Sequence, residues 1–355
     1  MDVARNQGTD SGGKAMGHGT NFINTAHLSR GRISLKRGNL FGQTPAKRRL
    51  LQTPHLQENA DAQIGFLLRK QLTLYSVSPL YKFSYDRLQE YSRQLCFVIA
   101  AEKQKGLAVH VEGDLKFKVK FSMLSVLKTS EQNEAGVLIQ VGITVSPSSL
   151  PPSALTQVTA ENAGPKVVWT GCFCCTRGND ILETVVEDFT CLPLFLVNGA
   201  ESLSAIIGTW LQQTFDCSFS LLTISPLNLA WMAAMWTGYK MERHKGAVEL
   251  TFSVPGTPQP LDISYAIHAE DAKALWDSIH TTQQEVRQEQ VDLFMDGLCY
   301  HFYRHFKIYL SATRLAKVST SVASAHANGK IKILHSAYLV EILALMTELA
   351  ISKIL

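Results

Sequence analysis

The sequence predicts an α+β fold built mainly from antiparallel sheets, because strand-like segments follow one another in series and helical segments occur in groups. The clearest strand covers residues 115–121, where four apolar residues alternate with three lysines. Two further strand-like runs, residues 137–145 and 166–175, precede the first long group of helical segments. A third observation is Asn328-Gly329, because this dipeptide is typical of a tight hairpin between antiparallel strands.

Apolar residues that recur at helical spacing indicate the helices. The first expected helix, residues 85–105, has Ser84 as its N-cap and ends before Gly106. Residues 227–239 are apolar on nearly all sides, so this helix is expected to be buried. Further helices are expected at residues 202–215, 269–280 and 338–354, with strands at residues 245–254 and 261–268. Thr282 and Glu285 have the spacing of a capping box for one more helix, whose apolar stripe includes Val291 and Phe302.

Length and composition limit the class of protein. The chain has 355 residues, 46% hydrophobic and 18% charged, which excludes a collagen, a coiled coil and a wholly disordered chain. We expect a disordered basic tail over residues 1–57, an N-terminal α+β subdomain over residues 58–200 and a C-terminal α+β subdomain over residues 201–355. We find no secretory signal at the N-terminus and no uninterrupted apolar run long enough for a membrane span.

Positive charge is concentrated in the tail. Residues 1–57 hold nine Lys or Arg and two Asp, whereas the rest of the chain has slightly more acidic than basic residues. Nine residues separate Lys36-Arg37 from Lys47-Arg48-Arg49, a spacing that suggests a bipartite nuclear import signal, with a generic solvated tail as the alternative. Thr44 and Thr53 each precede a proline, so both are candidate phosphorylation sites where phosphate would cancel nearby positive charge.

A stripe of lysines is the first candidate binding feature. Lys116, Lys118 and Lys120 are expected to project from one face of their strand at intervals of about 6.7 Å. Three positive charges in a row suit contact with the phosphate backbone of DNA. The alternative is that they keep an exposed strand soluble and block pairing at its edge.

The C-terminal hairpin, residues 314–335, is the second candidate. A two-residue turn at Asn328-Gly329 would pair Ala327 with Lys330. Alternation along the incoming strand gives it one face of small residues. The candidate partner-binding residues on the two strands are Ser319, Ser321, Ala323, Ala325, Lys330 and Lys332. Either a partner strand extends this edge or a helix of the same chain covers it, and the sequence leaves both open.

The sequence has no phosphate-binding loop, no dinucleotide fingerprint and no nucleophile elbow. We therefore expect no enzyme activity, no catalytic residue and no cofactor. His301 and His305 have the spacing of a helical metal pair. Because Phe302 stands where a zinc peptidase has its glutamate, packed or surface histidines are favoured over metal ligands.

Seven cysteines, an odd number, argue against a disulfide framework and favour reduced thiols in the nucleus or cytosol. A zinc site made of Cys172, Cys174, Cys175 and Cys191 would have unsuitable spacing, since neighbouring strand residues face opposite sides. Buried thiols are therefore expected at these positions.

Several long strings of this sequence resemble the centromere protein L family of vertebrates. One is LTLYSVSPLYKFSY at residues 72–85, and another is WMAAMW at residues 231–236. The others lie at residues 101–108, 168–171, 187–195, 271–277, 305–308, 310–315 and 319–326. The resemblance covers about residues 64–355, apart from a loop near residues 128–165.

The resemblance implies a non-enzymatic subunit of the constitutive centromere-associated network. Such a subunit forms a heterodimer with centromere protein N, helps to bind centromeric nucleosomes that contain centromere protein A, connects to other inner-kinetochore subcomplexes and supports chromosome segregation. The implied location is the nucleus, at the centromere and kinetochore. The implied fold has saddle-like, extended antiparallel sheets with helices packed on one side, and a dimer surface on the C-terminal sheet, here residues 306–335.

With this resemblance, the basic tail and the lysine stripes become candidate DNA contacts that neutralise phosphates without reading bases. No membrane and no small-molecule substrate is expected. The runner-up is a stand-alone nucleic-acid-binding protein, although the nearly neutral body counts against it. A third candidate, an enzyme with an unrecognised site, would show a pocket with titratable residues of shifted pKa.

Overall fold

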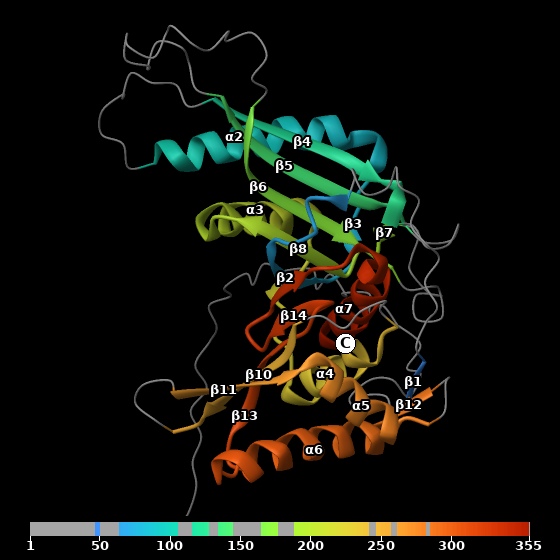
Figure 1. The fold of residues 1–355 in the computed structure, drawn as a ribbon. Helices are drawn as coiled ribbons and strands as arrows, with labels where there is room; N and C mark the ends of the chain where they lie inside the picture. The colour runs from blue at the N-terminus through green and yellow to red at the C-terminus, as the bar shows by residue number, and fades with distance from the viewer. Residues whose placement is uncertain are drawn as a thin grey trace, which may run out of the picture. The chain divides into compact units, whose positions relative to one another are not determined.

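The computed structural model describes residues 47–49, 64–105, 116–127, 134–144, 165–176, 188–240, 246–256, 261–281 and 285–354 (Figure 1). The helices are α2 (Leu88–Gln104), α3 (Glu201–Phe215), α4 (Pro226–Gly238), α5 (Ala269–Ile279), α6 (Gln288–Phe306) and α7 (Leu339–Ile354). The strands are β1 (Lys47–Arg49), β2 (Gln71–Val77), β3 (Leu80–Tyr81), β4 (Lys116–Leu124), β5 (Gly136–Thr144), β6 (Lys166–Cys174), β7 (Phe189–Thr190), β8 (Leu194–Gly199), β9 (Phe219–Leu221), β10 (Ala247–Val254), β11 (Leu261–His268), β12 (Glu285–Arg287), β13 (Arg314–Ser319), β14 (Ala323–His326) and β15 (Lys330–Ile333). This combination confirms the predicted α+β class.

One large open sheet contains eleven strands in the order β11-β10-β13-β14-β15-β2-β8-β6-β5-β4, with β9 paired to β2 beside this path. All pairings between these strands are antiparallel, as the sequence predicts. Strand β2 comes early in the chain, yet it lies between β15 from the C-terminal end and β8 from the middle. The sheet is therefore continuous between the two expected subdomains.

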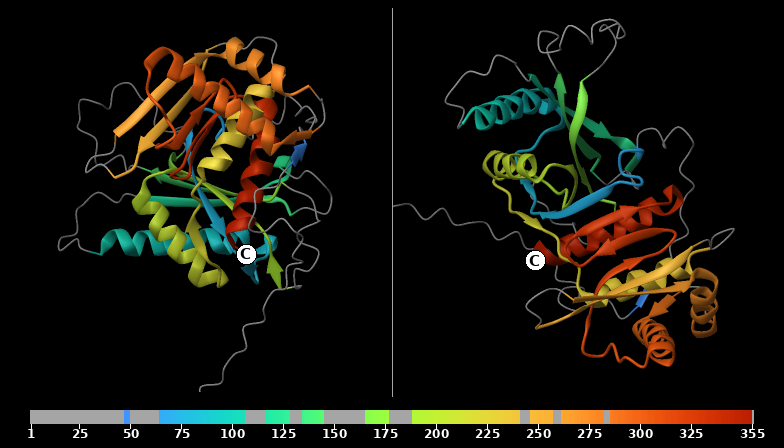
Figure 2. Two further views of the ribbon diagram at one scale, coloured as in Figure 1. Left: turned by 90° about the horizontal axis from the view of Figure 1, so that it is seen from below. Right: turned by 60° about the vertical axis from the view of Figure 1, so that its left-hand side comes forward.

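Two hydrophobic cores lie on opposite faces of this sheet. Along β8, Leu196 belongs to one core, whereas its neighbours Phe195 and Val197 belong to the other. Helices α4, α5, α6 and α7 supply the helical side chains of the first core, and α2 and α3 supply those of the second. Helices therefore lie on both faces of the sheet: α2 and α3 cover the N-terminal strands on one face, and α4, α5 and α6 cover the C-terminal strands on the other, where α7 also packs against β2 and β8 (Figures 1 and 2).

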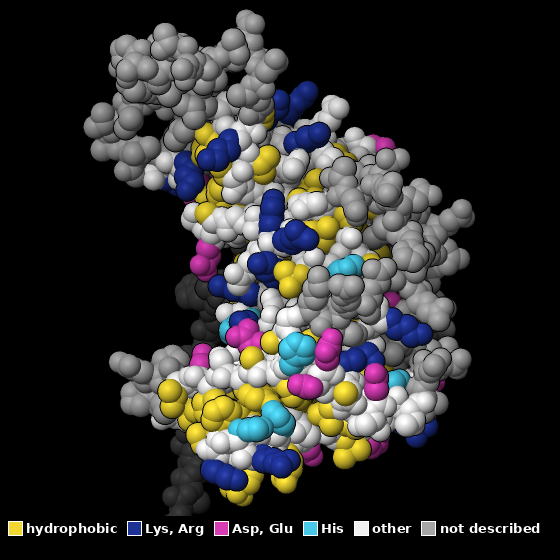
Figure 3. Space-filling model, viewed as in Figure 1, with side chains coloured by type: hydrophobic (Ala, Val, Ile, Leu, Met, Phe, Trp, Pro, Cys, Tyr) yellow, Lys and Arg dark blue, Asp and Glu magenta, His cyan; other side chains and the backbone are white. Residues whose placement is uncertain are grey.

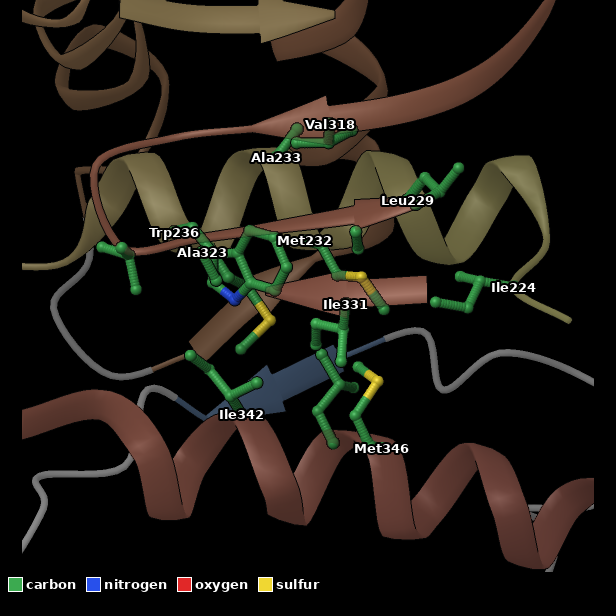
Figure 4. Close-up of a cluster of buried hydrophobic side chains, with 14 of the residues drawn as sticks. Ile224, Leu229, Met232, Ala233, Trp236, Val318, Ala323, Ile331, Ile342 and Met346 are labelled. Atoms are coloured by element: carbon green, nitrogen blue, oxygen red, sulfur yellow. The ribbon is translucent and has the colours of Figure 1, made fainter. Parts of the chain in front are cut away.

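Helix α4 forms the centre of the first core. Ser225 caps its start by accepting a hydrogen bond from the backbone N–H of Asn228 at 3.2 Å. The helix is apolar on nearly all sides and buried, as its sequence predicts. Figure 4 shows Met232 and Trp236 of α4 facing β14, the strand that carries Ala323, with side chains of α7 nearby. Since Ala323 is small, the helix can pack close to the sheet.

The C-terminal hairpin forms, but the predicted register is wrong by one residue. His326 lies opposite Lys330 and Ala325 opposite Ile331. The loop has three residues instead of two, because the N–H of Gly329 donates to the carbonyl of His326 at 3.0 Å and Gly329 has a left-handed φ of 77°. A shift of one residue exchanges the faces of a strand, so Ala323 and Ala325 point into the first core.

The expected incoming strand is in fact two strands, β13 and β14, which pair with each other. The hydroxyl of Thr320 makes the turn between them by accepting hydrogen bonds from the N–H groups of Val322 at 3.1 Å and Ala323 at 3.4 Å. A threonine hydroxyl can replace the usual turn residues in this way. The segment contains no Gly, Pro, Asn or Asp, which is why the sequence did not reveal the turn.

Replacing Thr320 by Val should destabilise the fold. The side chain keeps its size, but two backbone N–H groups in a buried turn lose their acceptor, which should lower the free energy of unfolding by about 1–3 kcal/mol. Urea denaturation followed by circular dichroism measures the change. Thr320→Ser keeps the hydroxyl and should be destabilised less, so equal effects in the two variants would contradict this role of the hydroxyl.

Candidate interaction surfaces

One face of the C-terminal half of the sheet carries polar side chains and is opposite the face on which α4, α5 and α6 pack. We call it the open face. Its residues alternate with core residues along five strands. They are Asp262, Ser264, Ala266 and His268 of β11, Glu249, Thr251 and Ser253 of β10, Arg314, Lys317 and Ser319 of β13, Ser324 and His326 of β14, and Lys330 and Lys332 of β15.

Charge is distributed unevenly over the open face. The basic side chains lie on β13 and β15, and the acidic ones on β10 and β11. The Nζ of Lys317 and a carboxylate oxygen of Glu249 are 3.4 Å apart, but both side chains are substantially exposed, so this ion pair contributes little to stability. Burial, with the positive charge of Lys317 second, lowers the pKa of His326, which favours its neutral form at pH 7.

The predicted partner-binding residues do not share one face of the sheet. Ser319, Lys330 and Lys332 lie on the open face, whereas Ala323 and Ala325 are fully buried in the first core. Ser321 lies in the turn after β13. The predicted position of this hairpin at a sheet edge is wrong, because β10 and β2 flank it on its two sides. Of the two alternatives for the small face, the structure shows cover by the chain's own helix α4.

The outermost strands of the large sheet are β4 and β11. Strand β4 exposes Lys118 and Lys120, and lysines on an edge strand oppose the addition of another chain. Strand β11 has no lysine and exposes Leu261 by 54%. Its eight residues therefore offer a less protected edge for strand addition.

The predicted lysine stripe lies on the face opposite the open face. Val119 and Phe121 of β4 point into the second core, so Lys118 and Lys120 project from the other side of the strand, where both are exposed. The backbone of Lys116 continues β4, while its side chain lies outside the described residues. Figure 3 shows Lys and Arg side chains gathered over the β4–β6 part of the molecule.

Three basic residues of the tail form a short strand. Lys47–Arg49 forms β1, which pairs antiparallel with β12, so Lys47 lies opposite Arg287. These three residues therefore form a strand within the expected tail, whose bounds stay a prediction. The other tail candidates, Lys36, Arg37, Thr44 and Thr53, lie outside the described residues.

The cysteines are reduced thiols, and most of them are buried. Cys172 and Cys174 belong to one core and Cys175 to the other, which confirms the expected buried thiols. Burial raises the pKa values of Cys172 and Cys174 well above the usual thiol range, and that of Cys191 to about 12. Within the described residues, no group of three or more His, Cys, Asp or Glu could hold a metal ion.

This burial predicts which thiols react. Cys96 and Cys299 are only partly buried, whereas the other five are buried, so N-ethylmaleimide at about pH 7.5 should label these two in the folded protein. Mass spectrometry of the labelled peptides identifies the sites, and labelling in urea provides the control for complete access. Rapid modification of Cys172 or Cys174 without denaturant would contradict the buried position of β6.

No helix in the described ranges has both the length and the apolar composition that crossing a membrane would require. The described residues form an α+β protein whose large open sheet has exposed polar side chains and two outermost strands. A family model described as centromere protein L matches residues 66–351. The chain belongs to the centromere protein L family, and the resemblance seen in its sequence strings is confirmed.

Individual relatives agree with this assignment. Centromere protein L of Gallus gallus is 58% identical over 323 residues and covers 90% of both chains. The Homo sapiens protein of that name is 57% identical over 334 residues, 94% of both chains. The Rattus norvegicus protein is 51% identical over 355 residues, the full length of both.

Proposed function

We propose that this chain is a non-enzymatic scaffold subunit of the inner kinetochore, within the constitutive centromere-associated network. The observation that carries the proposal is the family match over residues 66–351, whose relatives are named for the centromere. In this role the protein acts in the nucleus, at the centromere and kinetochore of the chromosome. It supports kinetochore assembly and chromosome segregation by binding, without a cofactor.

The proposed partner is centromere protein N, which forms a heterodimer with this chain on the open face. Ser319 and Ser324 lie opposite each other there, and such small side chains let a second sheet approach closely. The separation of basic from acidic strands would fix the orientation of a complementary partner. Lys330 and Lys332 supply the basic end, while other inner-kinetochore subcomplexes bind elsewhere on the heterodimer.

Reversing two charges tests this surface. Lys330→Glu with Lys332→Glu should weaken the complex with centromere protein N at least about tenfold, which corresponds to about 1.4 kcal/mol. Co-expression followed by light scattering gives the mass of the complex, and competition binding gives its affinity. Lys118→Glu with Lys120→Glu is the matched control, because it makes the same charge change on the opposite face.

If both double variants bind like the wild-type chain, the open face is not the dimer surface, and the edge of β11 becomes the next candidate. If the wild-type chain forms no complex, the proposed heterodimer is wrong. Circular dichroism of each variant separates loss of binding from loss of fold.

We propose that the lysine stripe on β4 contributes to binding the DNA of centromeric nucleosomes that contain centromere protein A. Lysines stand at every second residue from Lys116 to Lys120 along β4, and this spacing of charges suits a phosphate backbone. Because this face is opposite the open face, binding of DNA and of the protein partner would not compete. The contact neutralises phosphates and leaves recognition of the nucleosome to other groups.

Alanine at Lys116, Lys118 and Lys120 should weaken DNA binding by the heterodimer. The slope of log affinity against log salt concentration should fall by about 0.9 for each phosphate that the variant no longer neutralises. Fluorescence anisotropy with a labelled duplex at several salt concentrations measures both quantities. The matched control has alanine at three other exposed basic residues. These are Arg93 and Lys103 of α2 and Lys105, the C-cap of that helix.

An unchanged affinity and slope in the β4 variant would refute this role of the lysine stripe. The same experiment tests the runner-up function. If the isolated chain binds DNA as tightly as the heterodimer does, a stand-alone nucleic-acid-binding protein is the better description.

The proposals for the tail rest on the sequence alone. They are nuclear import through Lys36, Arg37 and Lys47–Arg49, and phosphorylation at Thr44 and Thr53.

A further inference from the structure

Two imidazole rings face each other on the surface of α6. His301 and His305 are four residues apart, so they lie on one face of the helix. Their Nε2 atoms are 3.2 Å apart and their ring centroids 4.5 Å apart, and both side chains are exposed. Figure 3 shows His side chains together among hydrophobic side chains near one end of this helix.

The separation of the two nitrogens suits a bound metal ion. Two nitrogen ligands at about 2.0–2.1 Å from a tetrahedral Zn²⁺ lie about 3.3 Å apart. The pair therefore has nearly this spacing, and an ion can enter from the solvent side with little rearrangement. In the absence of an ion, one Nε2–H can donate to the other Nε2, so a hydrogen bond is the competing explanation.

Tyr265 determines which nitrogen of His301 faces outward. Its hydroxyl is hydrogen-bonded to Nδ1 of His301, and its ring packs edge-on against Phe302 with centroids 5.2 Å apart. When Nδ1–H donates to this hydroxyl, the lone pair of Nε2 is free for a metal. A hydrogen bond of this kind to the second ring nitrogen is the usual support of a metal-binding histidine.

The position on the helix also favours a cation. His305 lies in the last turn of α6, where unpaired carbonyl groups create a partial negative charge. Lys307 follows the helix, but its Nζ lies over the ring of Tyr303 at 5.6 Å from the centroid. Neutral imidazoles select zinc, copper and nickel over magnesium and calcium, which prefer oxygen.

We propose that His301 and His305 form a two-histidine binding site for a divalent transition-metal ion of the zinc type, with Tyr265 as the positioning residue for His301. Water fills the remaining coordination positions, because the pair faces the solvent. This site does not depend on the proposed kinetochore function. It arises from α6 and β11 alone.

The test is a titration of the full chain with ZnCl₂ in competition with a colorimetric chelator at about pH 7.5. Cys96→Ser with Cys299→Ser serves as the background, since the partly exposed thiols could also bind zinc. In this background, His301→Gln and His305→Gln should each abolish the site. Tyr265→Phe should lower the affinity about 10- to 100-fold, as expected for loss of the supporting hydrogen bond.

His335 provides the matched control. It is also exposed, so His335→Gln should leave zinc binding unchanged. Equal zinc affinity in the Cys96→Ser/Cys299→Ser background chain and in its His301 and His305 variants would overturn the proposal.

A second readout needs no variant. Diethyl pyrocarbonate modifies accessible imidazoles, so zinc should protect His301 and His305 from it and leave His335 reactive. Mass spectrometry measures the modification at each site. If zinc changes the modification of neither His301 nor His305, the two rings share only a hydrogen bond and the proposal fails.

Discussion

The pairing of β2 with β15 on one side and β8 on the other is the interaction on which the rest of this structure depends. Without β2, the large sheet would separate into a C-terminal part ending at β15 and an N-terminal part beginning at β8. Leu72 and Leu74 of this strand belong to one core and Val77 to the other, so β2 also joins the two cores. Because β2 and β15 are far apart in sequence, their pairing has a considerable cost in chain entropy, which the apolar burial on both faces offsets.

The two groups of helices pack on opposite faces of the large sheet, and this arrangement determines which sheet surfaces are exposed. Helices α2 and α3 cover the N-terminal strands on one face, and α4, α5 and α6 cover the C-terminal strands on the other. Each half of the sheet therefore leaves a different face without these helices. As a result, Lys118 and Lys120 project from one face, and Lys330 and Lys332 from the other. The proposed contacts with DNA and with a protein partner can then occur together.

Small side chains have two different roles in this fold. Ala323 and Ala325 are buried and let α4 pack closely, whereas Ser319 and Ser324 are partly exposed on the open face. These residues alternate in one short hairpin, so a shift of one residue decides which of them a partner can reach. The turn at Thr320 and the three-residue loop at Gly329 set that register.

The sequence alone determined the α+β class, most helices, the β4 strand and the family, because these depend on local periodicity and on long matched strings. The burial of helix α4 was predictable since apolar residues surround it on nearly all sides. The tertiary structure alone decided the strand order, the position of the C-terminal hairpin inside the sheet and the faces on which the lysines lie. The physical reason is that a period of two shows that the faces of a strand differ, but not which distant strand or helix covers either one. Likewise, the spacing of His301 and His305 was visible in the sequence, whereas their approach to 3.2 Å beside Tyr265 required α6 to pack against β11.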